Sequence, residues 1–233
     1  YLASSKDHSI KRLVFIHVQY FVLLNTYQHT FFVSGFYSVA EFGYFTFAFS
    51  LANAVLLLFE SFSFLVFPKL LNRFALSTNE QISLLLKKVK DIYITSSHAM
   101  IHFAICFLPV FLLLFPKYAI VTNTFRMIAL TILIYVSCFG YQGLLIAKGE
   151  EKILGRITFF VLLINIISAL FLILLLKVPY SLVIIATLIS YIIYGLLLVI
   201  VGRKKLSLGV KFTFVFKDVY PARLLIPFLI SAC

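Results

Sequence analysis

The sequence predicts an all-α integral membrane protein, a bundle of six transmembrane helices with both termini in the cytoplasm. Three observations lead to this fold class. Of the 233 residues, 63% are hydrophobic and only 12% are charged, whereas a soluble domain has roughly 25% charged residues. The apolar residues form long continuous runs, and the Lys and Arg residues gather in alternate connectors between those runs.

Six stretches have the ~20 mostly apolar residues that a helix needs to cross ~30 Å of hydrocarbon. A membrane β-barrel would instead require strands of ~10 residues that alternate apolar and polar side chains, and these runs show no such alternation. Transmembrane helices are therefore expected, and the second span is expected to leave the membrane at Pro68. The stretches cover about 13–33, 43–67, 92–115, 125–147, 157–176 and 181–202.

The connector at 68–91 is longer than the others and predicts a surface helix. Ser77 and Glu80 have the spacing of a capping box and precede the amphipathic run QISLLLKKVKD. A helix is therefore expected to begin near Thr78 and to run along the cytoplasmic surface over 78–91 before the third span.

The chain divides into a six-helix lobe, 1–205, and a tail, 206–233. The end of the tail, PARLLIPFLISAC, is too short to cross a membrane and contains Pro227. It is either the start of a further helix or an interfacial piece, and we favour the start of a helix.

The orientation follows from the distribution of positive charge, because Lys and Arg accumulate in cytoplasmic connectors. Seventeen of the 20 Lys and Arg residues lie at the N-terminus, in the 68–91 and 148–156 connectors, or from Arg203 to the end of the chain. The opposite side holds only Lys117, Arg126 and Lys177. Both ends of the lobe are therefore expected in the cytoplasm.

The same distribution excludes a nucleic-acid partner, although the net charge is +12. The basic residues flank membrane spans and form no stripe with interleaved aromatic residues. Three lysines of the 78–91 segment are suited to hold it against anionic membrane lipid. The three cysteines are widely spaced in or beside apolar runs and give no disulfide or metal framework, and no cofactor motif is present.

Polar and ionisable residues enter the membrane in its cytoplasmic half on five of the six spans. Counted at 1.5 Å per residue from the span ends, these positions lie about 7 to 14 Å deep. We interpret them as candidates for a transport cavity and for proton coupling. They are His17, Glu60, His98, His102, Gln142 and Asn165.

Several of these residues also have a structural interpretation. Gln142 and Asn165 suit hydrogen bonds between helices, and His17 is close enough to the interface to be merely interfacial. His98 and His102 share a helix face, as in a metal site, but no acidic or cysteine ligand accompanies them, so a structural pair is favoured.

Glu60 is the strongest functional candidate, because it stands in the apolar run LLLFESFSFLVFPK. A carboxylate at that depth is costly unless it faces a wet cavity or a partner. Together with a nearby histidine it would take up and release protons near neutral pH.

The order and spacing of several motifs resemble the C-terminal half of the polysaccharide-exporting flippases, the O-antigen branch of the multidrug/oligosaccharidyl-lipid/polysaccharide exporter superfamily. The resemblance covers about residues 10–205. The motifs are SGFYSVAEFGYFTFAFSLAN, FPKLLNRF, LLIAKGEEKILGRITFFVLLINII and IATLISYIIYGLLLVI.

The resemblance implies one lobe of a two-lobe transporter that flips undecaprenyl-diphosphate-linked oligosaccharide across the bacterial inner membrane. The other lobe would precede Tyr1 in the same chain, and a polysaccharide polymerase or glycosyltransferases would be partners. Family members often have an acidic residue near the end of the first helix of this lobe, where this chain has Gln28 and His29. They also hold the diphosphate with buried basic residues; here only Arg126 and Arg156, at helix ends, or the other lobe could do so.

Two other classes stay open on the sequence. One is a multidrug or metabolite exporter of the same superfamily. The other is a membrane enzyme of polysaccharide assembly, against which the short outer connectors and the absence of a nucleophile paired with a base both argue. A transporter lobe without enzymatic activity is the favoured interpretation.

The predicted topology can be tested by the accessibility of single cysteines. We expect cysteines at Ser38, Tyr118 and Ser181 to react with a membrane-impermeant reagent added outside, and cysteines at Asn79 and Gly149 to react only from inside. Labelling of Gly149→Cys from outside would contradict the topology.

Overall fold

The computed structural model describes residues 27–211, 215, 218–220 and 224–232, and it contains no strand in these ranges. Residues 27–36 are helical and precede the first numbered element. The elements are α2 (Val39–Leu76), α3 (Asn79–Leu114), the 3-10 helix η1 (Pro116–Val121), α4 (Thr122–Ser137), α5 (Tyr141–Ala147), α6 (Glu151–Leu170), the π-helical turn η2 (Phe171–Leu175), the 3-10 turn η3 (Tyr180–Leu182), α7 (Ile184–Lys205) and α9 (Leu225–Ala232).

Five helical stretches in the described ranges are long and apolar enough to cross a membrane. They coincide with the second to sixth predicted spans, which confirms an all-α membrane protein. Most of the first predicted span lies outside the described residues, so the count of six and the side of each terminus stay predictions. The stretches are Val39–Leu58, Asn79–Leu114, Pro116–Ala147, Glu151–Leu175 and Tyr180–Lys205.

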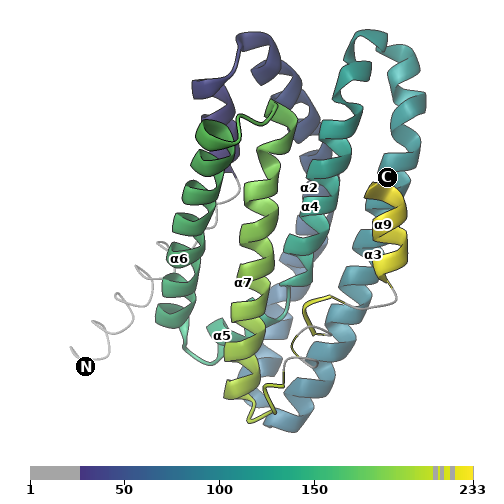
Figure 1. Cartoon of the computed structure of the whole chain (residues 1–233). Helices are drawn as coiled ribbons and strands as arrows, with labels where there is room; N and C mark the ends of the chain where they lie inside the picture. The colour runs from purple at the N-terminus through teal and green to yellow at the C-terminus, as the bar shows by residue number, and fades with distance from the viewer. Residues whose placement is uncertain (1–26, 212–214, 216–217, 221–223, 233) are drawn as a thin grey trace, which may run out of the picture.

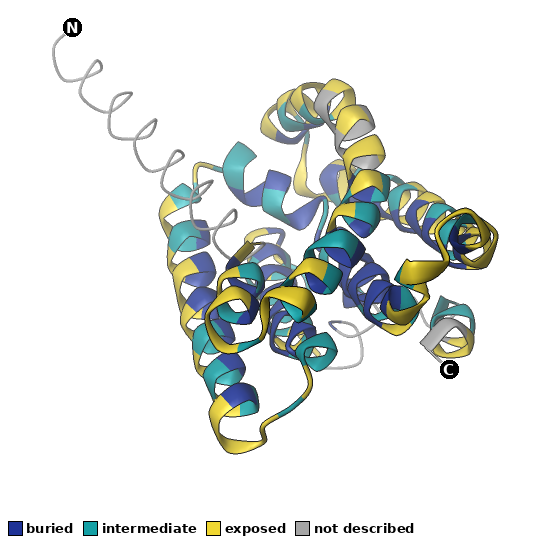
Figure 2. Cartoon of the chain, turned by 90° about the horizontal axis from the view of Figure 1, so that it is seen from above, coloured by how far each residue is buried: buried dark blue, intermediate teal, exposed yellow. Residues whose placement is uncertain are grey.

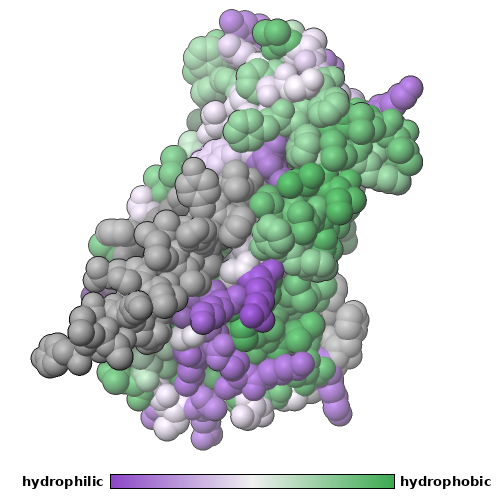
Figure 3. Space-filling view, turned by 90° about the vertical axis from the view of Figure 1, so that its left-hand side faces the viewer, coloured by the Kyte–Doolittle hydropathy of each residue, from purple (hydrophilic) through white to green (hydrophobic). Residues whose placement is uncertain are grey.

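The long helices run side by side, and their connectors alternate between the two ends of the bundle (Figure 1). The connectors at 77–78, 148–150 and 206–209 share one end, which we call the basic end because Lys and Arg flank all three. Figure 3 shows hydrophilic residues gathered at this end and an apolar region beside and above them. The basic end is the side that the charge distribution predicts to be cytoplasmic.

Helix α4 forms the centre of the bundle. In the most apolar part of the span that contains it, 83% of the residues are buried, against 28% for the Val39–Leu58 span, and α4 packs against α2, α3 and α7. The buried residues gather on the sides of the helices that face one another, while exposed residues lie on the outer sides (Figure 2). Many exposed side chains are large and apolar, such as Phe103 and Leu113, as expected for faces that contact lipid rather than water.

The buried core is divided along the bundle into two apolar clusters. One lies toward the basic end and includes Phe74, Leu144 and Leu198. The other lies toward the opposite end and includes Phe45 and Phe125.

Two helix ends differ from simple expectations. The second span is predicted to leave the membrane at Pro68, but helix α2 itself continues through Pro68 to Leu76. The capping box of α3 is formed one residue later than expected, by Thr78 and Gln81 instead of Ser77 and Glu80. Ser77 instead ends α2, its N–H donating to the carbonyl of Arg73. With only two residues between the helices, residues 79–91 continue directly into the third span as one helix.

The fourth predicted span is broken near its end, between α4 and α5. Gly140 stands in the break with φ +95°, a conformation that L side chains rarely adopt. A Cβ there would lie 2.7 Å from Leu86 Cδ1 and 3.2 Å from Lys90 Cγ of α3. The break therefore lets α3 approach closely and turns the first residue of α5, Tyr141, toward it.

We expect Gly140→Ala to destabilise the bundle, because the positive φ costs about 1–2 kcal/mol and the new methyl group overlaps Leu86. Gly149→Ala is the matched control: Gly149 also has a positive φ, +73°, but nothing lies within 4 Å of its Cβ position. Thermal unfolding in detergent should show a larger loss for Gly140→Ala. Equal losses would contradict the close packing at the break.

Candidate functional site

A short segment that follows α7, residues 218–220, docks on the bundle and brings two polar networks together. Val219 and Tyr220 are buried in the core cluster near the basic end. Val219 packs against α7, where a Cβ added at Gly195 would lie 3.4 Å from its Cγ1. Asp218 and Tyr220, on either side of it, make polar contacts with α3, α5 and α7.

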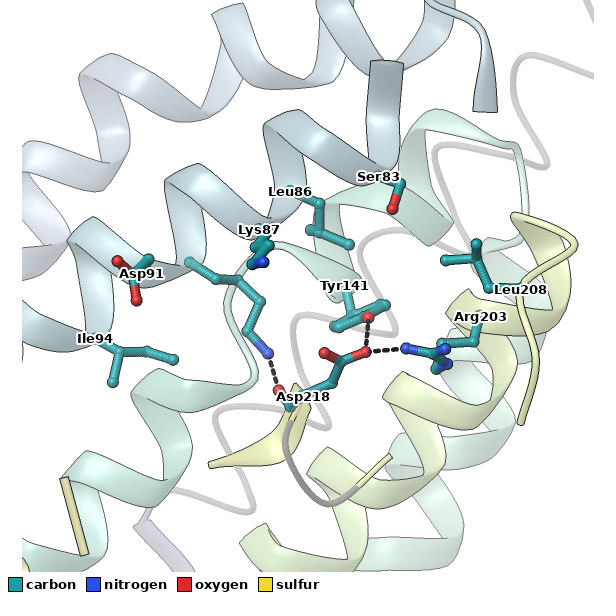
Figure 4. Close-up of a pocket in the computed structure, with 10 residues that line it drawn as sticks. Ser83, Leu86, Lys87, Asp91, Ile94, Tyr141, Arg203, Leu208 and Asp218 are labelled. Atoms are coloured by element: carbon teal, nitrogen blue, oxygen red, sulfur yellow. Dashed lines mark hydrogen bonds and ion pairs between the residues drawn. The ribbon is translucent and has the colours of Figure 1, made fainter. Parts of the chain in front are cut away.

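Asp218 is the centre of the first network (Figure 4). Its carboxylate accepts hydrogen bonds from Tyr141 Oη at 2.8 Å and from Arg203 Nη1 at 2.5 Å. Its main-chain carbonyl accepts one from Lys90 Nζ. Arg203 also donates through Nε to the carbonyl of Gly209 at 2.7 Å, which holds the connector that leads toward the segment.

Two glycines place Tyr141 in this network. Gly140 supplies the break that starts α5, and Gly202 of α7 has no side chain where the tyrosine ring lies. A Cβ on Gly202 would be 2.3 Å from Tyr141 Cδ1. The ring therefore lies against the backbone of α7 while Lys90 Nζ stands 4.8 Å from its centre, a cation–π distance.

A pocket of about 440 Å³ opens beside this network. Most of its wall comes from α3, and the rest from Tyr141, from Arg203 and from the chain that follows α7 (Figure 4). It combines five charged residues with hydroxyl and apolar groups. The lining residues are Ser83, Leu86, Lys87, Lys90, Asp91, Ile94, Tyr141, Arg203, Leu208 and Asp218.

The second network joins the two histidines of α3 to the docked segment. His98 Nδ1 and His102 Nε2 are 3.2 Å apart, and His98 Nε2 and Tyr220 Oη are 2.7 Å apart. His98 and Tyr220 are 3% and 5% exposed and lie inside the bundle, while His102 at the other end of this chain of hydrogen bonds is half-buried. His98 and His102 lie on the same face of α3, as predicted, and this placement brings their rings into contact.

The structure does not test two of the predicted site residues. His17 lies outside the described residues. Glu60 lies within α2, but its side chain is outside the described part of the chain. Of the residues four and three positions before it, which share its face of the helix, Leu56 is buried and Leu57 is 60% exposed, so this part of α2 has a packed side and an open side.

The other predicted residues are distributed over three helices. Gln142 is half-buried in the first turn of α5, and Asn165 is buried in α6 at 1% exposure. Arg126 is half-buried near the start of α4, while Arg156 is exposed near the start of α6. Because α4 and α6 begin at opposite ends of the bundle (Figure 1), these two arginines of the chain cannot hold one diphosphate together.

Sequence reasoning missed the first network. Arg203 was counted only as a topology signal, and Tyr141 falls in a predicted span. Lys90 was expected to contact anionic lipid with the other two lysines of the 78–91 segment, but it is buried and bonds to Asp218 instead. The available signal was Asp218, the only acidic residue after Glu151, which stands alone in a basic tail. A single carboxylate among many cations is a natural partner for more than one of them.

Among the described residues, no group of three or more His, Cys, Asp or Glu side chains is placed to hold a metal ion. Comparison with known proteins finds no matching family model, no similar curated protein and no similar solved structure. The features of the chain that bear on its function are therefore the bundle and its polar networks.

The His98–Tyr220 contact can be tested by Tyr220→Phe. This variant removes one oxygen and leaves a buried imidazole nitrogen without that partner, so a loss of about 1–3 kcal/mol of unfolding free energy is expected. In the control, Tyr118→Phe, the ring keeps its stacking on Phe47 at 4.1 Å, and we expect a change within about 0.5 kcal/mol. Equal unfolding curves for the two variants would mean that the hydrogen bond contributes nothing.

Proposed function

We propose that the chain is one lobe of a secondary transporter that flips an undecaprenyl-diphosphate-linked oligosaccharide from the cytoplasmic to the outer leaflet of the bacterial inner membrane. The substrate would be the repeat unit of O-antigen or of another polysaccharide. An N-terminal lobe of the same chain would form the second wall of the cavity. Glycosyltransferases would supply the substrate and a polysaccharide polymerase would use it.

The observation that supports the proposal best is the chain of hydrogen bonds from His102 through His98 to Tyr220. It lies within a bundle whose outer faces are apolar. Ionisable side chains in such a place are costly, and they commonly mark the path of a substrate or a proton. A transporter driven by protons needs groups of this kind inside the membrane, whereas a purely structural bundle does not.

The connectors at the end opposite to the basic end favour a transporter over a polysaccharide polymerase. Helices α3 and α4 are joined there through η1, six residues long, and α6 and α7 are joined through residues 176–183. A polymerase is expected to carry a large extracytoplasmic loop, and these connectors leave no place for one between the described helices.

In the proposed mechanism, protons bind in the cytoplasmic half of the cavity and bias the equilibrium between inward-open and outward-open states. A ligand shifts such an equilibrium only through its different affinity for the two states. Glu60 and the two histidines are the proposed proton-binding groups, and His17, Gln142 and Asn165 are proposed to line the same cavity. Alternating access would be a rocking of the two lobes about a site near the midplane.

The proposed function can be tested by complementation of a flippase-deficient strain with the full-length protein. Surface polysaccharide should be restored by the whole protein and not by residues 1–233 expressed alone, because one lobe supplies only one wall of the cavity. Restoration by residues 1–233 alone would refute the two-lobe mechanism, and no restoration by any form would refute the flippase.

We expect Glu60→Gln to insert and fold normally, since the amide keeps the shape of the carboxyl group while removing its charge. Transport in the full-length protein should fall or lose its dependence on pH. Glu80→Gln is the matched control, because Glu80 is exposed in the first turn of α3. Normal transport with an unchanged pH profile in Glu60→Gln would contradict the proposal and show that Glu60 has only a structural role.

A further inference from the structure

The pocket beside Asp218 carries more positive than negative charge. Lys87, Lys90 and Arg203 line it, against Asp91 and Asp218, so the formal balance is one positive charge. Pocket walls from α3 and α7 bring these three cations to one hollow at the basic end of the bundle (Figure 4).

Lys90 bonds to the main-chain carbonyl of Asp218, so the carboxylate charge of that residue acts on the Lys90 ammonium without a direct hydrogen bond. The carboxylate oxygen Oδ2 is shared by Arg203 and Tyr141. The ammonium group of Lys90 donates instead to the main-chain carbonyl of Asp218, which carries a dipole and no net charge. Lys90 is only 7% exposed, and a buried ammonium is costly unless an anion compensates it.

We propose that this pocket binds a phosphate or diphosphate group. Arg203 presents a planar fork of N–H donors and Lys90 a compact positive charge, the two donor types that proteins use for phosphate oxygens. Lys87, exposed at the mouth of the pocket, adds a third charge. The volume of about 440 Å³ lies within the range of small-molecule sites, roughly 300–1,000 Å³.

Asp218 competes with the proposed ligand. Its carboxylate and carbonyl oxygens already accept hydrogen bonds from Arg203 and Lys90, the donors that would hold phosphate. A bound phosphate group would therefore take over some of these bonds and weaken the docking of residues 218–220. The anion and the segment would exclude each other in part.

The phosphate group belongs either to a membrane lipid or to a soluble molecule. The pocket would bind the same chemical group in both cases. Leu86, Ile94 and Leu208 add apolar surface to the pocket wall, which suits either a lipid headgroup or a larger soluble phosphate ester. The inference does not rest on the flippase proposal, because it concerns the charges of this pocket alone. Its failure would leave the complementation test unaffected.

Native mass spectrometry of the full chain, released from an uncharged detergent, measures binding in two arms. Inorganic pyrophosphate tests a soluble source, and phosphatidic acid, with phosphatidylcholine as the uncharged reference, tests a lipid source. Binding in either arm supports the pocket and identifies the source. Absence of binding in both arms overturns the proposal.

Variants show whether the binding occurs in this pocket. Lys90→Gln should weaken it about tenfold, the loss expected for one charge-assisted hydrogen bond. Asp218→Asn should strengthen it, because it removes the competing charge. Lys204→Gln, exposed and outside the pocket wall, should leave it unchanged.

Because Lys90 is buried, its variant could fail to fold, and the pair Lys87→Gln and Lys88→Gln avoids this difficulty. Both lysines are exposed neighbours on α3, but only Lys87 lines the pocket. Weaker binding in Lys87→Gln alone supports the proposal. Equal loss in both variants would indicate a general attraction of anions to the basic end and would overturn it.

Discussion

The bonds to Asp218 are the interaction on which the arrangement at the basic end depends. A single residue of the chain after α7 receives hydrogen bonds from α3, α5 and α7, through Lys90, Tyr141 and Arg203. Three helices that are far apart in sequence thus share one partner. Removing its carboxylate would leave the partly buried guanidinium of Arg203 and the hydroxyl of Tyr141 without that acceptor, which is more costly than the loss of the bonds themselves.

The backbone at two glycines allows the three helices to reach Asp218. A continuous fourth helix would carry Tyr141 past α3, but the break at Gly140 turns it toward Lys90, and Gly202 lets its ring lie against α7. Docking of residues 218–220 then places Tyr220 beside His98, so the charged network and the histidine chain are held by the same short segment. A change in one network is therefore expected to reach the other through residues 218–220.

Long apolar runs predicted the helices well, because a helix that faces lipid must be apolar along its whole length. The helix face shared by His98 and His102 was also predictable, since a spacing of four residues fixes it locally. The length of α2 was not predictable, because Pro68 stays inside that helix although proline usually ends or kinks a helix. The tertiary contacts were not predictable either, because the partner of Lys90 and that of Arg203 lie 128 and 15 residues away in sequence. No local pattern encodes such pairings, and only the isolation of Asp218 in a basic tail indicated them.

A double-mutant cycle on Asp218 and Arg203 tests the central claim most directly. Unfolding free energies would be measured for Asp218→Asn, Arg203→Gln and the double variant, with Lys204→Gln replacing Arg203→Gln in a parallel cycle. Residues that share a hydrogen-bond network show coupling energies of about 0.5–3 kcal/mol. We expect a coupling of about 1 kcal/mol or more for the pair with Arg203 and none for the pair with Lys204. Additive effects in the first cycle would show that Asp218 does not hold the basic end together.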